Sequence, residues 1–170
     1  SHTLSIVLHC IGDFERISDH AINIMEAAQE MHNKKLTFSP KAEEELKVFS
    51  RAVQDIVEKA YAVFRDQDEK LAQKVEPLEA VVDDLNQEVK KRHIRRLRNG
   101  KCTIELGFIL SDITTSLERV ADHCSNIAVC VTQVRDDTYD THGYLNSVKN
   151  EDSEIFRGLV LEAEEKYLLP

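Results

Sequence analysis

The sequence is poor in the residues that build turns, aromatic cores and membrane spans. It has no tryptophan, only three prolines and five glycines, and 6% aromatic residues. So few turn-forming residues favour long helices over a β-sandwich, which needs a turn after every short strand. No run of about 18 apolar residues and no signal peptide occur. We therefore expect an all-α chain that does not itself span a bilayer, with any membrane link outside it.

Cysteine and positive charge are also limited, and each limit excludes a class of function. The four cysteines (Cys10, Cys102, Cys124 and Cys130) have no CxxC spacing, which argues against a zinc site and favours reduced thiols over a disulfide framework. Acidic residues outnumber basic ones by 31 to 22, which gives a net charge of −9. Nucleic acid is not an expected ligand, because phosphate binding needs a dominant basic face. A cation is the expected small ligand.

What the sequence does contain is an internal repeat. Residues 14–24 and 117–127 share the pattern ER-x-x-DH, and each copy sets a glutamate four residues before an aspartate, namely Glu15 with Asp19 and Glu118 with Asp122. At helical spacing the two carboxylates of a copy lie on one face, about one turn apart, where they repel each other. The arginine that follows each glutamate projects about 100° away and does not neutralise the pair. A metal ion or another helix is the expected counter-charge.

A third acidic pair has the same register. Glu79 and Asp83 each follow an apolar heptad position by one residue, as the acids of the two repeat copies do. Antiparallel packing of two helices would bring Glu79 and Asp83 opposite Glu118 and Asp122. The shared register favours a joint metal site over three solvated helix flanks. Carboxylate oxygens suit Mg²⁺, Ca²⁺ or Mn²⁺, and bridged carboxylates also hold iron.

Hydrophobic periodicity predicts five long helices joined by short connections. They cover about residues 4–32, 41–64, 68–98, 103–135 and 151–167, with a polar linker over 136–143. Ser39 and Asp68 are expected N-caps, and Gly100 is expected to stop the third helix. Pro77 predicts a kink or a late restart of that helix.

Heptad spacing defines one apolar contact stripe on each of the first four helices. The first stripe comprises Leu4, Val7, Ile11, Phe14, Ser18, Ala21, Met25 and Ala28. The next three comprise Leu46, Phe49, Val53, Ile56, Ala60 and Val63; Leu71, Val75, Leu78, Val82, Leu85 and Val89; and Leu110, Thr114, Leu117, Ala121, Cys124, Ala128 and Val131. The first stripe can be covered by the other helices or by a second copy of the chain across a two-fold axis. We expect a homodimer through the first helix, which would bring Glu15 and Asp19 near acids of the second chain.

The third predicted helix ends in a basic run over residues 90–101. Cations near a helix C-terminus complement the helix dipole, which is the simplest explanation. The alternative is a docking surface for an anionic membrane leaflet or an acidic partner.

Four stretches make the chain resemble the PhoU-like cytoplasmic region at the C-terminus of bacterial sodium/phosphate cotransporter family proteins. They are residues 13–21, 78–85, 92–102 and 117–123, and the resemblance covers nearly the whole chain. It implies an antiparallel helical bundle with one complete three-helix repeat plus part of another. Residues 1–36 would be the third helix of a truncated first repeat, residues 39–136 the complete repeat, and residues 137–170 a linker and a C-terminal amphipathic helix.

The resemblance also implies a site, a function and a location. In this family ExxxD motifs gather metal ions, often iron or zinc, in clusters. That assigns one cluster to four carboxylates, Glu79, Asp83, Glu118 and Asp122, while Glu15 and Asp19 carry the motif of the incomplete repeat. The metal stays open among iron, zinc, manganese, magnesium and calcium. The implied function is regulation of phosphate transport or phosphate-status signalling. The implied partner is the transmembrane transporter portion of the same parent protein, at the cytoplasmic face of the bacterial inner membrane.

Two alternatives to a metal-binding regulator remain open. One is a structural helical adaptor, or a stand-alone PhoU-type regulator, without a metal cluster. The other is a di-iron carboxylate enzyme, which is disfavoured because such sites use Glu-x-x-His, whereas His20 and His123 follow their glutamates by five residues and turn about 140° away. We therefore do not expect an enzyme. These histidines are expected at the surface or in contact with the ligands, and a place for them among the ligands stays open. Asn23 and Asn126, on the aspartate face, are candidates for contact with the ligands.

Overall fold

The computed structural model describes residues 2–136 and 153–170, and all the regular structure in these ranges is helical. The helices are α1 (His2–Lys34), α2 (Pro40–Asp66), the single turn α3 (Glu69–Ala72), α4 (Val75–Arg98), α5 (Ile104–Asp136) and α7 (Ser153–Lys166). The predicted all-α fold is confirmed. Most of the predicted linker over 136–143 lies outside the described residues. None of the described helices combines the length and the apolar character needed to cross a membrane.

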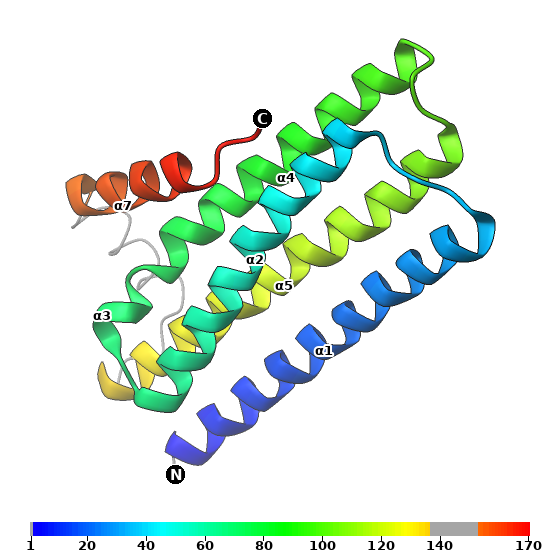
Figure 1. The fold of residues 1–170 in the computed structure, drawn as a ribbon. Helices are drawn as coiled ribbons and strands as arrows, with labels where there is room; N and C mark the ends of the chain where they lie inside the picture. Colours follow the sequence, from blue (N-terminus) through cyan, green and yellow to red (C-terminus); the bar gives the residue numbers. More distant parts are fainter. Residues whose placement is uncertain (1, 137–152) are drawn as a thin grey trace.

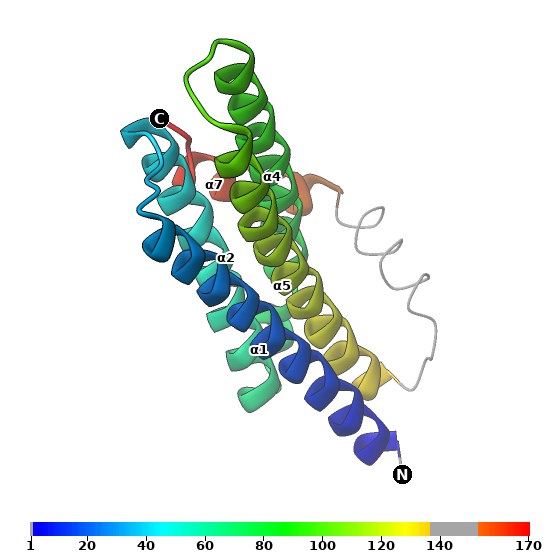
Figure 2. The same ribbon diagram turned by 90° about the vertical axis from the view of Figure 1, so that its right-hand side faces the viewer.

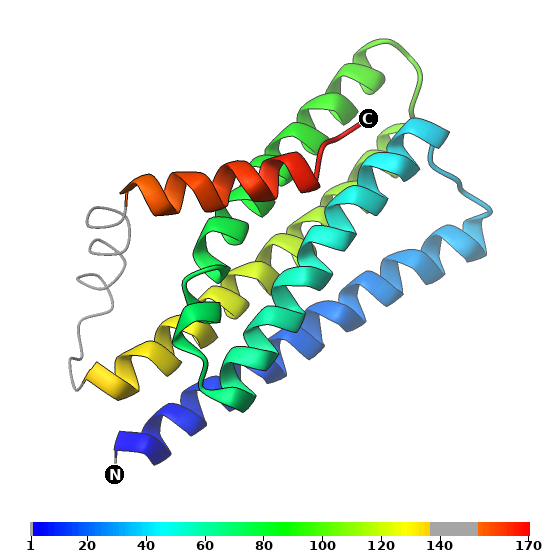
Figure 3. The same cartoon turned by 60° about the vertical axis from the view of Figure 1, so that its left-hand side comes forward.

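Four long helices run side by side, and the chain reverses direction at each connection (Figure 1). α5 is the central helix, because it packs against α1, α2 and α4. Figure 2 shows α1 on the outside of the bundle next to α5. α7 crosses the bundle on another side, where it packs against α4 (Figure 3). α4 and α5 are therefore antiparallel neighbours, as the metal-site prediction requires.

The core is built from the stripes predicted for the second, third and fourth helices. Every member of the stripe on α5, from Leu110 to Val131, is buried. On α2 and α4 the same holds apart from Leu46, which is half-buried, and Leu71 is half-buried in α3. Phe49 and Ile56 are completely buried. Heptad periodicity therefore identified the inner faces of these helices correctly.

The helix ends follow the local chemistry of the sequence. Ser39 caps α2 and accepts a hydrogen bond from the backbone of Ala42, with Pro40 in the first turn. Asp68 caps α3 by accepting from the backbone of Leu71 at 3.1 Å. α4 starts at Val75, two residues before Pro77, so the predicted late restart is confirmed. Gly100, with φ of 66°, ends α4 in the left-handed region that glycine adopts without steric cost.

α1 turns a different face inward from the one that its heptad stripe predicts. Cys10 and Ala27 are buried, and Ile6, Ile17 and Ile24 pack against the core. Of the predicted stripe, only Phe14 packs against the core, with its ring 5.3 Å from that of Phe64 of α2. The others face solvent: Leu4, Val7, Ile11, Ser18, Ala21, Met25 and Ala28.

The wrong choice of face on α1 has a physical cause. The true inner face includes the polar residues Asp13 and His20, so it looks less apolar in the sequence than the outer face. Asp13 is nevertheless satisfied there, because its Oδ1 accepts a hydrogen bond from Nδ1 of His123 on α5 at 2.9 Å. The covered face of α1 therefore combines apolar contacts with a polar partner on α5 for Asp13.

A buried ion pair holds α2 to α4. Glu45 of α2 is 3% exposed and accepts hydrogen bonds from both terminal nitrogens of Arg96, at 3.1 and 2.9 Å. Arg92 donates to the same carboxylate at 3.3 Å and to the carbonyl oxygen of Pro170 at 2.6 Å. Two of the basic residues in the run over 90–101 are thus structural.

α4 and α5 approach closely at Gly107. A Cβ atom at this position would lie 3.1 Å from Nε2 and 3.7 Å from Cδ2 of His93, a buried residue of α4. Burial lowers the pKa of His93, and the charge of Arg96 lowers it further, so the ring is neutral near pH 7. The glycine allows the helices to pack against this neutral imidazole.

Candidate metal centre

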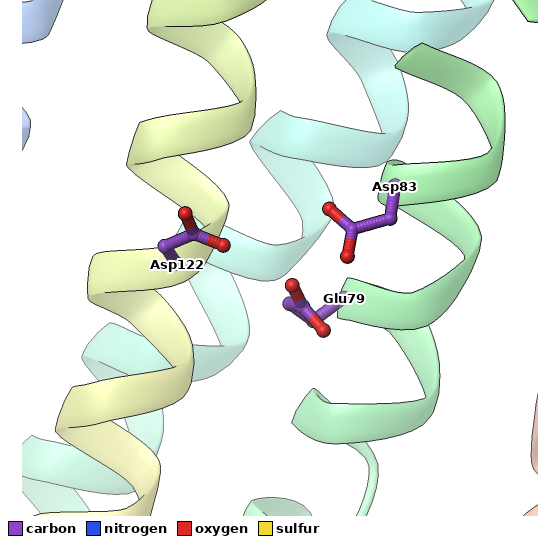
Figure 4. Close-up of side chains that lie close together, drawn as sticks. All are labelled: Glu79, Asp83 and Asp122. Atoms are coloured by element: carbon purple, nitrogen blue, oxygen red, sulfur yellow. The ribbon is translucent and has the colours of Figure 1, made fainter. Parts of the chain in front are cut away.

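Three carboxylates from α4 and α5 meet on one side of the bundle. Glu79 and Asp83 lie one turn apart on α4, and Asp122 approaches them from α5 (Figure 4). One oxygen of each side chain lies within 4.8 Å of an oxygen of each of the other two. The structure therefore brings together three of the six carboxylates that the sequence predicts as metal ligands.

Neighbouring apolar residues set the position of each carboxylate. Leu78 and Val82, which precede Glu79 and Asp83, are buried in the core and fix the rotation of α4. On α5 the small residues Ala121 and Cys124 are completely buried on either side of Asp122. Small side chains permit close approach of the two backbones, which brings carboxylates from the two helices within reach of one ion.

The electrostatics of the cluster disfavour three negative charges. Burial raises the pKa of Glu79 to about 9, with further contributions from the charges of Asp83 and Glu76 and from hydrogen bonding with Asp83 and Asp122. The pKa of Asp83 and that of Asp122 are also raised, in each case mainly by partial desolvation of the carboxylate, although Asp122 as a whole residue is exposed. Without a cation, Glu79 therefore holds a proton at neutral pH.

One oxygen of the cluster has no hydrogen-bond partner among the described residues. It is Oδ1 of Asp83, which is buried. Within residues 2–136 and 153–170, none of the three carboxylates forms an ion pair with a lysine or arginine. A buried carboxylate oxygen without a partner is costly, and a bound cation would remove the cost. The donor set, made of carboxylate oxygens only, fits a hard divalent cation.

Two further glutamates lie at the edge of the cluster. The charge of Glu118 raises the pKa of Asp122, but its Oε2 accepts a hydrogen bond from Nδ2 of Asn86 at 2.8 Å. Glu76 acts electrostatically on all three carboxylates and accepts a hydrogen bond from Ser125 of α5. Glu118 was predicted as a ligand, and the structure places it beside the three rather than among them.

The acids of the first repeat copy lie elsewhere. Glu15 and Asp19 are both exposed on α1, outside the cluster formed by α4 and α5. Asn23 is exposed on the same helix, and Asn126 is exposed on α5, where it lines a groove with His9 of α1.

The two repeat histidines meet each other and not the carboxylates. The rings of His20 and His123 stack with centroids 5.6 Å apart and an interplanar angle of 20°. His123 donates to Asp13, and burial, together with the charge of His123, lowers the pKa of His20. The two copies of the repeat therefore face each other across the α1–α5 interface.

Sequence reasoning missed the residues that surround the cluster. Glu76 precedes Glu79 by three residues, so helical spacing could have placed it on the same face. Asp13 precedes His20 by seven residues, which also puts both on one face of α1. The bond from Asn86 to Glu118 joins two helices, and no local spacing predicts it.

The arrangement can hold a divalent cation by three side chains on an open side of the bundle. Because Asp122 is exposed, water has access to an ion bound there. Hard cations commonly keep water ligands when the protein supplies only a few oxygens.

Comparison with known proteins is consistent with the sequence resemblance. The family model described as "PhoU domain" matches residues 46–131, which covers most of α2, all of α3 and α4, and most of α5. The chain is also similar to the phosphate-specific transport system accessory protein PhoU homolog 1 of Thermotoga maritima, with 29% identity over 121 residues. That alignment covers 71% of this chain and 51% of the relative, so the chain spans about half the length of that curated relative. Comparison with solved structures gives no match.

Proposed function

The chain belongs to the PhoU domain family, and from this premise we propose that it is a non-catalytic regulatory module that binds a metal ion and acts in the control of phosphate transport. The Thermotoga relative is described as an accessory protein of a phosphate-specific transport system, which supports the link to phosphate. The observation that carries the metal-binding part of the proposal is the group of Glu79, Asp83 and Asp122 with its buried, unpartnered oxygen.

We propose that these three carboxylates are the primary ligands. Glu118 is one helical turn from Asp122 and can join the ligand set if it gives up its hydrogen bond from Asn86. Oxygen donors favour Mg²⁺, Ca²⁺, Mn²⁺ or Fe²⁺ over Zn²⁺, which prefers nitrogen and sulfur. When bound, the cation supplies the positive charge that the described residues do not supply.

We also propose that the module works beside the transmembrane part of a sodium/phosphate cotransporter, at the cytoplasmic face of a bacterial inner membrane. The motifs over residues 13–21, 92–102 and 117–123 support this context. In that setting Glu15 and Asp19 would form half of a second site that needs another helix. A stand-alone PhoU-type regulator is the alternative, favoured by the description of the Thermotoga relative.

Metal analysis tests the central proposal. The chain is purified without chelator, dialysed against a mixture of Mg²⁺, Ca²⁺, Mn²⁺, Fe²⁺ and Zn²⁺, and analysed by inductively coupled plasma mass spectrometry. We expect bound metal in the parent chain and its loss in the variant Asp83→Asn with Asp122→Asn. Asp84→Asn is the control, because Asp84 is exposed and its replacement removes one negative charge next to Asp83 while leaving the three carboxylates in place. Full metal content in the double variant would exclude this site.

We further propose that the outer face of α1 pairs with a second copy of the chain. It exposes six large apolar side chains: Leu4, Val7, Leu8, Ile11, Ile22 and Met25. In a solution of this chain alone, a second copy is the available apolar surface that can cover it. Light scattering should give a dimer that dissociates in Leu8→Ser with Ile11→Ser, whereas Ile155→Ser, at an equally exposed position on α7, leaves it intact. A strict monomer at high concentration would contradict this proposal.

A further inference from the structure

The end of the bundle where α4 meets α5 is basic, although the chain as a whole is acidic. Residues 90–101 contain seven basic residues and no acidic one. Arg92 and Arg96 bind Glu45, and Lys90 donates to Thr115. Lys91 forms an ion pair with Glu88 at 3.7 Å. In the part of the chain that the structure describes, the other three cations of the run are exposed and form no ion pair: Arg95, Arg98 and Lys101. Their charge is therefore available to a partner.

Exposed apolar side chains lie on the same end. Ile94 of α4 is 49% exposed, and Ile104 and Phe108 of α5 are 72% and 70% exposed. The three line a groove of about 320 Å³ between the two helices, which continues over Leu97 and Gly107. Exposed apolar residues that cluster, instead of being scattered singly, mark interaction sites.

The cations and the apolar residues form one surface. Ile94 and Arg98 are one turn apart on α4, and Lys101 follows in the connection to α5. Ile104 and Phe108 are likewise one turn apart at the start of α5. A surface with apolar and aromatic side chains at its centre and arginine or lysine at its margin is the pattern of proteins that bind at the membrane interface.

We propose that this end of the bundle docks onto an anionic phospholipid surface, with Phe108, Ile104 and Ile94 in the interfacial layer and Arg95, Arg98 and Lys101 against lipid phosphates. An anionic membrane complements this end in charge, through the three exposed cations, and in apolar character, through the groove beside them. The same surface repels the acidic remainder of the chain, whose net charge is −9, and so orients the molecule with this end inward. The proposal goes beyond the regulatory function above, because it needs neither a bound metal nor a transporter.

Vesicle binding by the full chain tests the proposal. The probes are vesicles of phosphatidylcholine alone and of phosphatidylcholine with about a third phosphatidylglycerol. We expect flotation with the anionic vesicles only, and loss of binding at high salt, which screens surface charge. Each cation near an anionic surface contributes roughly fivefold to partitioning, so Arg95→Gln with Arg98→Gln should weaken binding roughly 25-fold. Lys70→Gln with Lys74→Gln removes equal charge from exposed positions in and next to α3 and should have little effect.

A second measurement reports insertion directly. Because the chain has no tryptophan, Phe108→Trp introduces a single tryptophan whose emission, excited selectively over that of the four tyrosines, should shift to the blue on anionic vesicles. Phe108→Ser should weaken binding, whereas Ile155→Ser, 60% exposed in the parent chain, should not. Circular dichroism serves as the control for whether each variant is folded. Equal binding to neutral vesicles, or no binding to either, would overturn the proposal. Binding to polyglutamate without a blue shift on vesicles would also overturn it, in favour of an acidic protein partner.

Discussion

Replacing two carboxylates of the candidate metal centre should change stability in opposite directions, depending on whether metal is present. Asp83→Asn with Asp122→Asn keeps the side-chain shapes but removes two charges that burial and mutual repulsion disfavour. In metal-free protein the variant should be more stable than the parent, and with metal it should be less stable.

The structure sets the size of the effect. The ligand oxygens lie within 4.8 Å of one another. At that distance two unit charges repel by roughly 3.5 kcal/mol at an effective dielectric constant near 20, and by roughly 0.9 kcal/mol in bulk water. Because Asp122 is exposed, we expect a gain of about 1–2 kcal/mol for the metal-free variant. In a chain of this length that raises Tm by about 2–8 °C.

Metal binding should reverse the order. A ligand present at about 100 times its Kd stabilises the folded state by about 2.7 kcal/mol, which raises the Tm of the parent chain by about 5–11 °C. The double variant should show no such shift.

Differential scanning calorimetry, with and without chelator, measures both effects, and Asp84→Asn serves as the control that keeps the metal response. If the metal-free double variant melts below the parent chain, or if metal still raises its Tm, the carboxylates are not a strained metal site.

Three other predictions follow from the same structure. Metal binding should release a proton from Glu79, whose pKa is about 9 without metal, and calorimetry in buffers of different ionisation enthalpy should detect this release between about pH 5 and 9. Because folding raises this pKa, the stability that the protonated Glu79 contributes to the metal-free protein is full below about pH 4.5 and is lost as the pH rises through 9. Glu45→Gln leaves the half-buried Arg96 without its counter-charge and should cost about 3 kcal/mol in urea unfolding, whereas replacing both residues by leucine should cost less. Equal losses would show that the pair is not coupled. Gly107→Ala should destabilise the folded chain by about 1 kcal/mol, because the added Cβ meets a buried histidine of α4. Gly12→Ala, where the added Cβ has nothing within 4 Å, should instead stabilise the chain by up to about 1 kcal/mol through helix propensity. A stabilised Gly107→Ala variant would show that the histidine moves aside freely.

The sequence by itself determined the fold class, the helix ends and the inner faces of three helices. This worked where the apolar residues lie on one face only, as from Leu110 to Val131, and where a cap such as Ser39 has a chemical reason to end a helix. It also placed Glu79, Asp83 and Asp122 in one register. Local spacing fixes which side chains share a helix face, so these features need no knowledge of the neighbouring helix.

Only the tertiary structure decided which face of α1 is covered and which acids meet. α1 has apolar residues on two faces. The face that packs against the core is the one with the weaker heptad pattern, and it carries Asp13, which contacts His123 on α5. Glu118 shares the register of Asp122 but accepts a hydrogen bond from Asn86, so it stands beside the cluster. Both outcomes depend on pairings between residues far apart in the chain, whose energies arise only when the helices pack, and one-dimensional periodicity carries no information about them.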